Sequence, residues 1–131
     1  MPHNPPACGG SDDWLSRARS DLALASVRPA KNIRLEDLCY HAQQSVEKSL
    51  KAVLIHSETI FPHTHNIKIL TGLLPPRIFQ DPILAAASIL TDYAVTARYP
   101  GEVEPVTKGE LKTALHIAGE VLIWAKSVVG Q

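Results

Sequence analysis

Apolar residues recur at intervals of three or four between positions 35 and 56, and this spacing predicts one long, unbroken helix. At a rise of about 1.5 Å per residue, the helix would extend for roughly 30 Å or slightly more. The pattern is typical of a helix that buries a single stripe in a core. The stripe consists of Leu35, Leu38, Cys39, Ala42, Val46, Leu50, Val53 and Leu54.

Related patterns predict four further helices, three long and one short. The first runs from Asp12 to just before Pro29, and the short third helix runs from residue 66 to 74, where Pro75 ends it. The fourth, at 82–97, is apolar nearly all round, as expected for a helix that others surround. The buried positions expected on the first and fifth helices are Trp14, Ala18, Leu22, Ala25, Leu111, Leu115, Ala118, Leu122, Ala125 and Val129.

Capping signals suggest where these helices begin. Asp81-Pro82 combines an Asp N-cap with Pro at the first helical position. Thr107-x-x-Glu110 has the spacing of a capping box. The expected N-caps, in chain order, are Ser11, Asn32, Thr64 or His65, Asp81 and Thr107.

No segment alternates with period two, so the sequence predicts an all-α fold. Short connections favour antiparallel neighbours, and we expect an up-and-down antiparallel four-helix bundle with one additional short helix. The second face of the fifth helix, which carries Ile117 and Trp124, has two interpretations. An exposed pair would favour a protein interface, whereas a buried pair would complete the core.

The composition sets outer limits on function. The 131 residues suffice for one domain, expected at 12–129 after a Pro- and Gly-rich disordered leader at 1–11. Basic and acidic residues balance at thirteen each, so a strongly basic nucleic-acid footprint is missing overall, although a local patch is compatible with this balance. No apolar run has the length of a membrane span, and no signal peptide is recognisable. Cys8 and Cys39 do not make a disulfide framework, which favours the cytoplasm, and we expect Cys39 in the core.

The remaining face of the long helix carries unusual polar chemistry. Tyr40, Gln43, Gln44, Glu47 and Lys51 line one side of it, and a second row, with His41 and Lys48, overlaps that side. Amides, an imidazole, a phenol and paired charges suit recognition of a polar ligand. The simpler interpretation is an exposed face on which Glu47 and Lys51 form an i,i+4 ion pair worth a few tenths of a kcal/mol.

Residues 40–52 (YHAQQSVEKSLKA), together with three further segments, resemble HEPN domains (higher eukaryote and prokaryote nucleotide-binding). Residues 40–52 match the second-helix signature of that family. The other three segments are Trp14-x3-Ala18-x2-Asp21-Leu22-x2-Ala25, residues 62–67 (PHTHNI) and Tyr93-x4-Arg98-Tyr99-Pro100-Gly101. The resemblance covers most of the chain from Asp12 to Lys126, and it implies a homodimer with its site near the dimer interface.

The candidate ligand site combines two helices. Arg98 ends the predicted fourth helix, where the helix dipole favours a cation, and its planar guanidinium suits phosphate. Across from it we expect Gln44, Glu47, Lys48 and Lys51 from the long helix, with Tyr99 beside Arg98. The alternative for Arg98 is a surface residue at a helix C-terminus.

Many HEPN proteins are metal-independent ribonucleases with an R-x4-6-H motif. Arg98 matches the Arg of that motif, but the positions for its His hold Val103, Glu104 and Pro105. Self-sufficient RNA cleavage is therefore in doubt, and His41 and Glu47 are weak candidates for a replacement base. Tyr93-x4-Arg98-Tyr99-Pro100 instead resembles the subgroup found beside minimal nucleotidyltransferases, often as toxin–antitoxin pairs.

We find no phosphate loop and no zinc spacing, so we expect neither a cofactor nor a metal site. His63-x-His65 would be a poor metal site, and we expect His65 to fix its loop by hydrogen bonding.

Three hypotheses follow. The leading one is a nucleotide- or RNA-binding HEPN partner of a nucleotidyltransferase. The second is a ribonuclease toxin with a degenerate motif, and the third is a helical interaction or dimerisation module without a nucleotide site.

Overall fold

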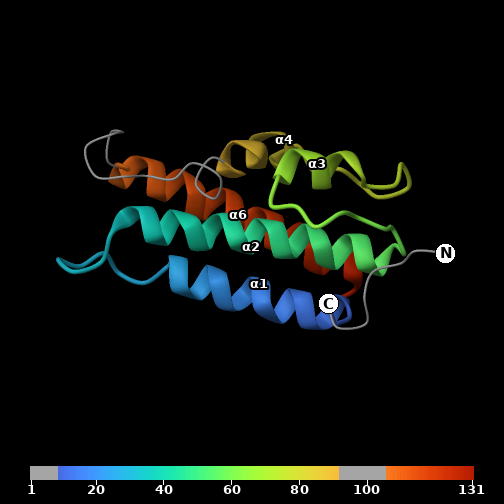
Figure 1. Ribbon diagram of the computed structural model, residues 1–131, viewed down its shortest axis with the longest axis horizontal. Coiled ribbons are helices and arrows are strands. Elements are labelled where there is room, and N and C mark those ends of the chain that lie inside the picture. Colours follow the sequence, from blue (N-terminus) through green and yellow to red (C-terminus); the bar gives the residue numbers. More distant parts are fainter. Residues whose placement is uncertain (1–8, 92–105) are drawn as a thin grey trace.

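The computed structural model describes residues 9–91 and 106–131, and these residues form helices and no strands. The helices are α1 (Ser11–Ala25), α2 (Leu35–His56), α3 (Ile67–Gly72), α4 (Ile83–Ala87), the 3₁₀ helix η2 (Ser88–Thr91) and α6 (Lys108–Val129) (Figure 1). The part of the predicted leader at residues 1–8 and the part of the predicted fourth helix beyond residue 91 lie outside the described residues, as do Arg98 and Tyr99.

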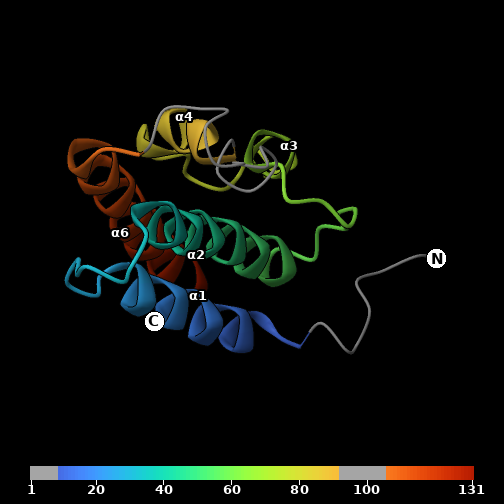
Figure 2. The ribbon, with the colours of Figure 1, turned by 60° about the vertical axis from the view of Figure 1, so that its left-hand side comes forward.

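The long helix α2 is the centre of the bundle. It packs against α1 on one side, against α3 and η2 on another, and against α6 behind (Figures 1 and 2). The chain reverses direction from α1 to α2, again through α3 and α4, and again into α6. The predicted all-α, up-and-down antiparallel bundle is therefore confirmed, with α3, α4 and η2 together occupying the place of one long helix.

The predicted stripe of α2 forms the middle of the core. Of its eight positions, seven are buried and only Leu35, in the first turn, remains partly exposed. Cys39 is fully buried, as expected. The largest side chains that are fully buried come from every layer of the bundle: Leu15, Leu50, Leu54, Ile67, Leu70, Leu90 and Val121.

One of the predicted N-caps, Thr107, is confirmed. The Thr107 hydroxyl accepts from the Glu110 N–H at 3.0 Å while the Glu110 carboxylate accepts from the Thr107 N–H at 3.1 Å, so the capping box is complete. Asp81 Oδ1 accepts from the backbone N–H of Ile83 at 3.0 Å, but Pro82 is the residue that precedes α4, so the expected N-cap at Asp81 is one residue too early. Both motifs depend on contacts within a single turn, which sequence spacing alone specifies.

The other predicted N-caps are wrong by one or two residues. Gly10 rather than Ser11 precedes α1, and Arg34 rather than Asn32 precedes α2; neither makes a side-chain capping bond. Helix α3 is capped by Asn66, whose side chain accepts from the Ile69 N–H at 3.2 Å. Thr64 instead accepts from the Asn66 N–H at 3.0 Å, so it stabilises the turn before the helix.

The second face of α6 belongs to the core. Ile117 and Trp124 are both buried. The indole N–H of Trp124 donates to the carbonyl oxygen of Phe79 at 2.7 Å, which ties α6 to the connection between α3 and α4. Of the two interpretations of this face, the one that completes the core is confirmed.

No helix in the described ranges has both the length and the apolar character needed to cross a lipid bilayer.

Candidate functional site on helix α2

A buried carboxylate on α1 holds two cationic or titratable side chains of α2. Asp21 is 6% exposed, and its Oδ1 lies 2.9 Å from Nδ1 of His41 while its Oδ2 lies 2.5 Å from Nζ of Lys48. His41 and Lys48 are seven residues apart, about two helical turns, so both project towards α1. Asp21 therefore joins α1 to two side chains of α2 from a buried position.

A second cluster surrounds Glu47, which directly precedes Lys48 and contacts the α2–α3 connection instead of α1. Its Oε2 lies 2.9 Å from Nζ of Lys51, and its Oε1 lies 2.9 Å from Nδ1 of His65 in the α2–α3 connection. The side-chain amide of Gln43 donates to the same Oε1 at 3.4 Å and to the His65 carbonyl oxygen at 3.4 Å. The expected ion pair and the expected fixing of the loop by His65 are both confirmed.

The Glu47–Lys51 ion pair of this second cluster is almost completely enclosed, whereas the side chain of His65 is 66% exposed. Glu47 is 2% exposed and Lys51 is 8% exposed. The Lys51 ammonium lies 5.5 Å from the centre of the Trp14 ring and 5.9 Å from the centre of the Phe61 ring. Those distances fit cation–π attraction. The two aromatic rings, which come from separate segments, therefore offset part of the hydration free energy that the Lys51 ammonium loses on burial.

Burying charged side chains between helices carries a large desolvation cost. Taking a carboxylate and an ammonium out of water costs several kcal/mol per ion, and good geometry only offsets that cost. Within the described part of the chain, three buried polar atoms also lack a hydrogen-bond partner: Trp14 Nε1, Gln43 Oε1 and Ser49 Oγ. Buried polar groups in proteins are nearly always hydrogen-bonded, to protein or to ordered water, so a bound water is one way in which these three atoms would be satisfied.

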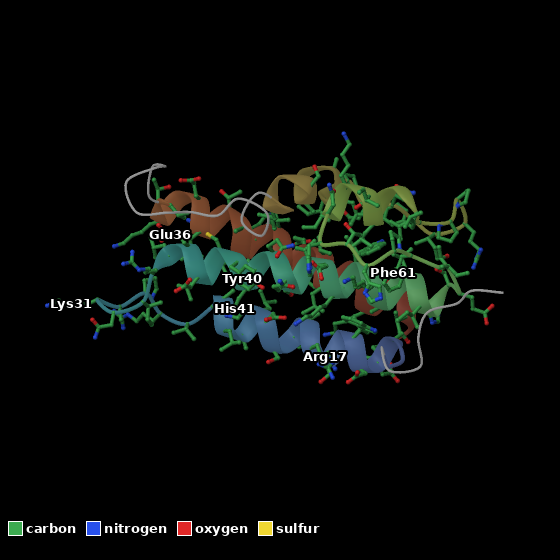
Figure 3. The ribbon with its side chains drawn as sticks, in the orientation of Figure 1. Arg17, Lys31, Glu36, Tyr40, His41 and Phe61 are labelled. Carbon is green, nitrogen blue, oxygen red and sulfur yellow. The ribbon has the colours of Figure 1, made fainter. Side chains whose placement is uncertain are left out.

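The accessible part of this polar surface lies nearer the start of α2. The exposed Tyr40 ring stands edge-on to the His41 ring with 5.6 Å between centres, and its hydroxyl accepts at 2.7 Å from the amide of Gln44, which is itself only 8% exposed. Figure 3 shows Tyr40 and His41 together on α2, with Phe61 beside its other end. The helix therefore has an accessible polar end and an enclosed ionic end.

The pattern of the family model fits this architecture. The model of the HEPN domain matches residues 11–128, which runs from the start of α1 almost to the end of α6. The chain belongs to the HEPN domain family. HEPN domains commonly dimerise and bind nucleotide or RNA.

Solved structures agree with the family assignment. The crystal structure of TT1696 from Thermus thermophilus is 26% identical in sequence, with a TM-score of 0.78 over 90% of this chain and 97% of that one. The crystal structure of ST0689, an archaeal HEPN homologue, is 25% identical, with a TM-score of 0.72 over 92% of this chain and 98% of that one. No curated protein sequence matches the chain significantly.

The HEPN domain brings the predicted α2 residues into two clusters rather than one row. Glu47 and Lys51 point into the protein beneath the α2–α3 connection, whereas Lys48 turns towards α1 and Gln44 lies beside Tyr40. Arg98 and Tyr99 are outside the described residues, so the predicted juxtaposition with α2 stays a prediction.

Sequence reasoning missed the bridge from His41 through Asp21 to Lys48. The contact joins positions 20 and 27 residues apart, and helical spacing within α2 does not reveal it. The available signal was the position of Asp21 at the edge of an apolar stripe, next to Ala18 and Leu22. A carboxylate there needs a cationic partner, and the two nearest in register on α2 are His41 and Lys48.

One pocket lies away from the predicted site, and the described residues hold no candidate metal site. A pocket of about 400 Å³ opens between α3 and α4, with Lys68, Thr71 and Ser88 in its wall and none of the predicted site residues. Across residues 9–91 and 106–131, no three His, Cys, Asp or Glu side chains are grouped so that they could hold a metal ion.

Proposed function

We propose that this HEPN domain binds nucleotide or RNA through helix α2 together with Arg98 and Tyr99. The observation that carries the proposal is the family match, which extends over residues 11–128 and includes both α1 and α2. Lys48 and Arg98 hold phosphate, since ammonium and guanidinium groups make strong charge-assisted hydrogen bonds to its oxygens. Gln44, which is 8% exposed, lies beneath this surface and positions the Tyr40 hydroxyl.

The buried ions support this assignment by giving α2 a fixed arrangement. Glu47 and Lys51 bond to each other beneath the surface, and His65 and Asp21 attach α2 to its neighbours. A site whose side chains are already in place loses little entropy when its ligand binds. In this proposal Glu47, Lys51 and Gln44 shape the site, and Lys48 meets the ligand.

We further propose that the protein acts as a cytoplasmic homodimer and as the partner of a nucleotidyltransferase, in a toxin–antitoxin type of pair. The support is the resemblance of Tyr93-x4-Arg98-Tyr99-Pro100 to the HEPN subgroup found beside such enzymes. Tyr99 carries a hydroxyl that such a transferase would be able to modify.

Removing both proposed phosphate contacts should weaken binding by about tenfold or more, because a hydrogen bond to a charged group contributes about 1.5–3 kcal/mol. The change is Lys48→Ala with Arg98→Ala. The measurement is fluorescence anisotropy with a labelled single-stranded RNA, and isothermal titration with ATP, GTP and UTP. Far-UV circular dichroism confirms that the double variant is folded.

The matched control removes two positive charges from α6, by Lys112→Ala with Lys126→Ala. Its affinity should stay within about twofold of the wild-type value at the same salt concentration. Equal affinities for the wild-type protein and the Lys48/Arg98 variant would reject this site. Wild-type protein that binds none of the probes would favour the interaction-module hypothesis.

The partner proposal predicts a stable complex with a nucleotidyltransferase. If a gene adjacent to this one encodes such an enzyme, the two proteins produced together should co-purify through size-exclusion chromatography. Mass spectrometry of the complex after incubation with a nucleoside triphosphate then reports any nucleotide added to Tyr99, with Tyr99→Phe as the control. Separate elution of the two proteins would contradict the partnership.

A further inference from the structure

The pocket between α3 and α4 has the size of a small-molecule site. Its volume is about 400 Å³, and ligand pockets usually measure about 300–1,000 Å³. At about 30 Å³ for each water molecule in the liquid, the volume equals roughly thirteen waters, which is room for a short organic molecule. The pocket lies on the side of α2 away from α1, so it is separate from Lys48 and its contact with α1 (Figure 2).

Hydrogen bonds within the wall fix two hydroxyl groups of the pocket. The Thr71 hydroxyl donates to the carbonyl oxygen of Ile67 at 2.9 Å. The Ser88 hydroxyl donates to the carbonyl oxygen of Ala85 at 3.2 Å. Because each hydroxyl has one proton and uses it in this way, its oxygen is left to accept a hydrogen bond from a ligand.

The charge of the wall favours an anionic ligand. Lys68 supplies an ammonium group, and the described part of the wall includes no carboxylate. Asp81, the acidic residue next to the pocket residue Gln80 in the chain, already accepts from the backbone N–H of Ile83 at 3.0 Å. The side-chain amide of Gln80 adds two further N–H donors. A cationic ligand would meet only repulsion from Lys68, whereas an anionic one gains an ion pair.

The same groups favour a carboxylate over a phosphate. One ammonium balances the single charge of a carboxylate, and the Gln80 amide offers a donor for its second oxygen. A phosphate monoester carries a charge of about −1.5 to −2 at neutral pH. The planar fork of Arg recognises phosphate best, and the wall, as far as the structure describes it, contains no Arg.

The remaining wall suits an aliphatic body. Leu84, which is buried, and Ala85 and Gly72 supply its apolar surface. Hydrocarbon that leaves water for such a surface binds favourably, roughly in proportion to the area covered. None of the described wall residues is aromatic, so a nucleobase would have no ring on which to stack.

We propose that the pocket between α3 and α4 binds a short aliphatic carboxylic acid in its ionised form. Lys68 and Gln80 hold the carboxylate oxygens, and Leu84 contacts the hydrocarbon chain. Thr71 and Ser88 accept from a hydroxyl group where the ligand carries one. The inference goes beyond the proposed function, because it involves neither nucleotide nor RNA and uses a different face of the bundle.

The test titrates the full chain with hexanoate and follows the backbone amide signals by two-dimensional NMR. Signals from residues 68–72 and 84–88 should shift saturably, with a Kd in the millimolar range or tighter. Hexanamide has the same size without the charge, and hexylammonium reverses the charge. Both should bind at least about tenfold more weakly, since they lose the charge-assisted hydrogen bond to Lys68. Hexyl phosphate, the alternative anion, should also bind more weakly than hexanoate.

Two substitutions test the wall itself. Lys68→Met keeps most of the hydrocarbon part of the side chain and should weaken hexanoate binding at least about tenfold. A methyl group at Gly72 would meet no neighbouring atom within 4 Å, so Gly72→Leu should fill the pocket without displacing its wall and abolish binding. The matched controls on α6 are Lys112→Met and Gly119→Leu, since Gly119 has equally open surroundings. Both controls should bind hexanoate as the wild type does, and circular dichroism checks that every variant is folded.

The outcomes are independent of RNA binding. Absence of saturable shifts, equal affinities for hexanoate and hexanamide, or tighter binding of hexyl phosphate would each overturn the inference. Hexanoate binding that persists in folded Gly72→Leu would also overturn it. If that variant does not fold, Lys68→Met and the hexanamide comparison still decide. Gly72→Leu should bind RNA as the wild type does, so this inference and the proposed function can fail separately.

Discussion

Replacing Glu47 by alanine is expected to lower the free energy of unfolding by about 3–5 kcal/mol, because it leaves a buried ammonium without its counter-ion. Glu47 is 2% exposed, and its loss removes the 2.9 Å contact of the Lys51 ammonium. That ammonium would then have only the neighbouring Trp14 and Phe61 rings to stabilise its charge. Urea denaturation followed by circular dichroism measures the change. A stability loss below about 1 kcal/mol would contradict the assignment of Glu47 and Lys51 as a dehydrated ion pair.

Two further variants isolate the cause. Glu120→Ala removes an exposed carboxylate from α6 and should change the stability by no more than about 0.5 kcal/mol. Glu47→Leu combined with Lys51→Met removes both charges, and apolar replacement of a buried ion pair is often neutral or stabilising. The double variant should therefore be clearly more stable than Glu47→Ala.

The same double variant addresses why the chain keeps a buried ion pair at all. If the ions only join α2 to its neighbours, a stable apolar pair serves equally well and ligand binding is unaffected. In the proposed function, Glu47 and Lys51 hold Lys48 and Gln44 in place, so binding should weaken although the fold is intact. Stability and affinity therefore separate the structural role of the pair from its functional one.

The α2 stripe was predictable because every contact that defines it repeats along a single helix. Seven of its eight positions are buried, and the Glu47–Lys51 pair follows from the same periodicity. The depth of that pair was not predictable. Its burial depends on Trp14 from α1 and Phe61 from the α2–α3 connection, and the spacing of residues within α2 does not predict either contact.

The helix N-termini likewise include one that local sequence predicted and others that it did not. The Thr107–Glu110 capping box lies within one turn, so local spacing was sufficient to find it. Before α3, three adjacent residues have side chains able to cap a helix, namely Thr64, His65 and Asn66. Local spacing does not distinguish between them. His65 bonds to Glu47 instead, so tertiary contact with α2 decides which of the three caps the helix.

Leu50→Ala should lower the free energy of unfolding by about 2–5 kcal/mol, through lost burial and the cavity that remains. Leu50 is 0% exposed on the face of α2 that forms the middle of the bundle, and its neighbours come from several helices that cannot all close the gap. The matched control is Ile123→Ala on α6, where the side chain is 62% exposed and the expected loss is below about 1 kcal/mol. Chemical denaturation of both variants beside the wild type measures the difference, and similar losses would mean that α2 is not the centre of the core. Because Lys48 and Glu47 precede Leu50 on the same turn, loosened packing at Leu50 should also weaken RNA binding while the variant is still folded.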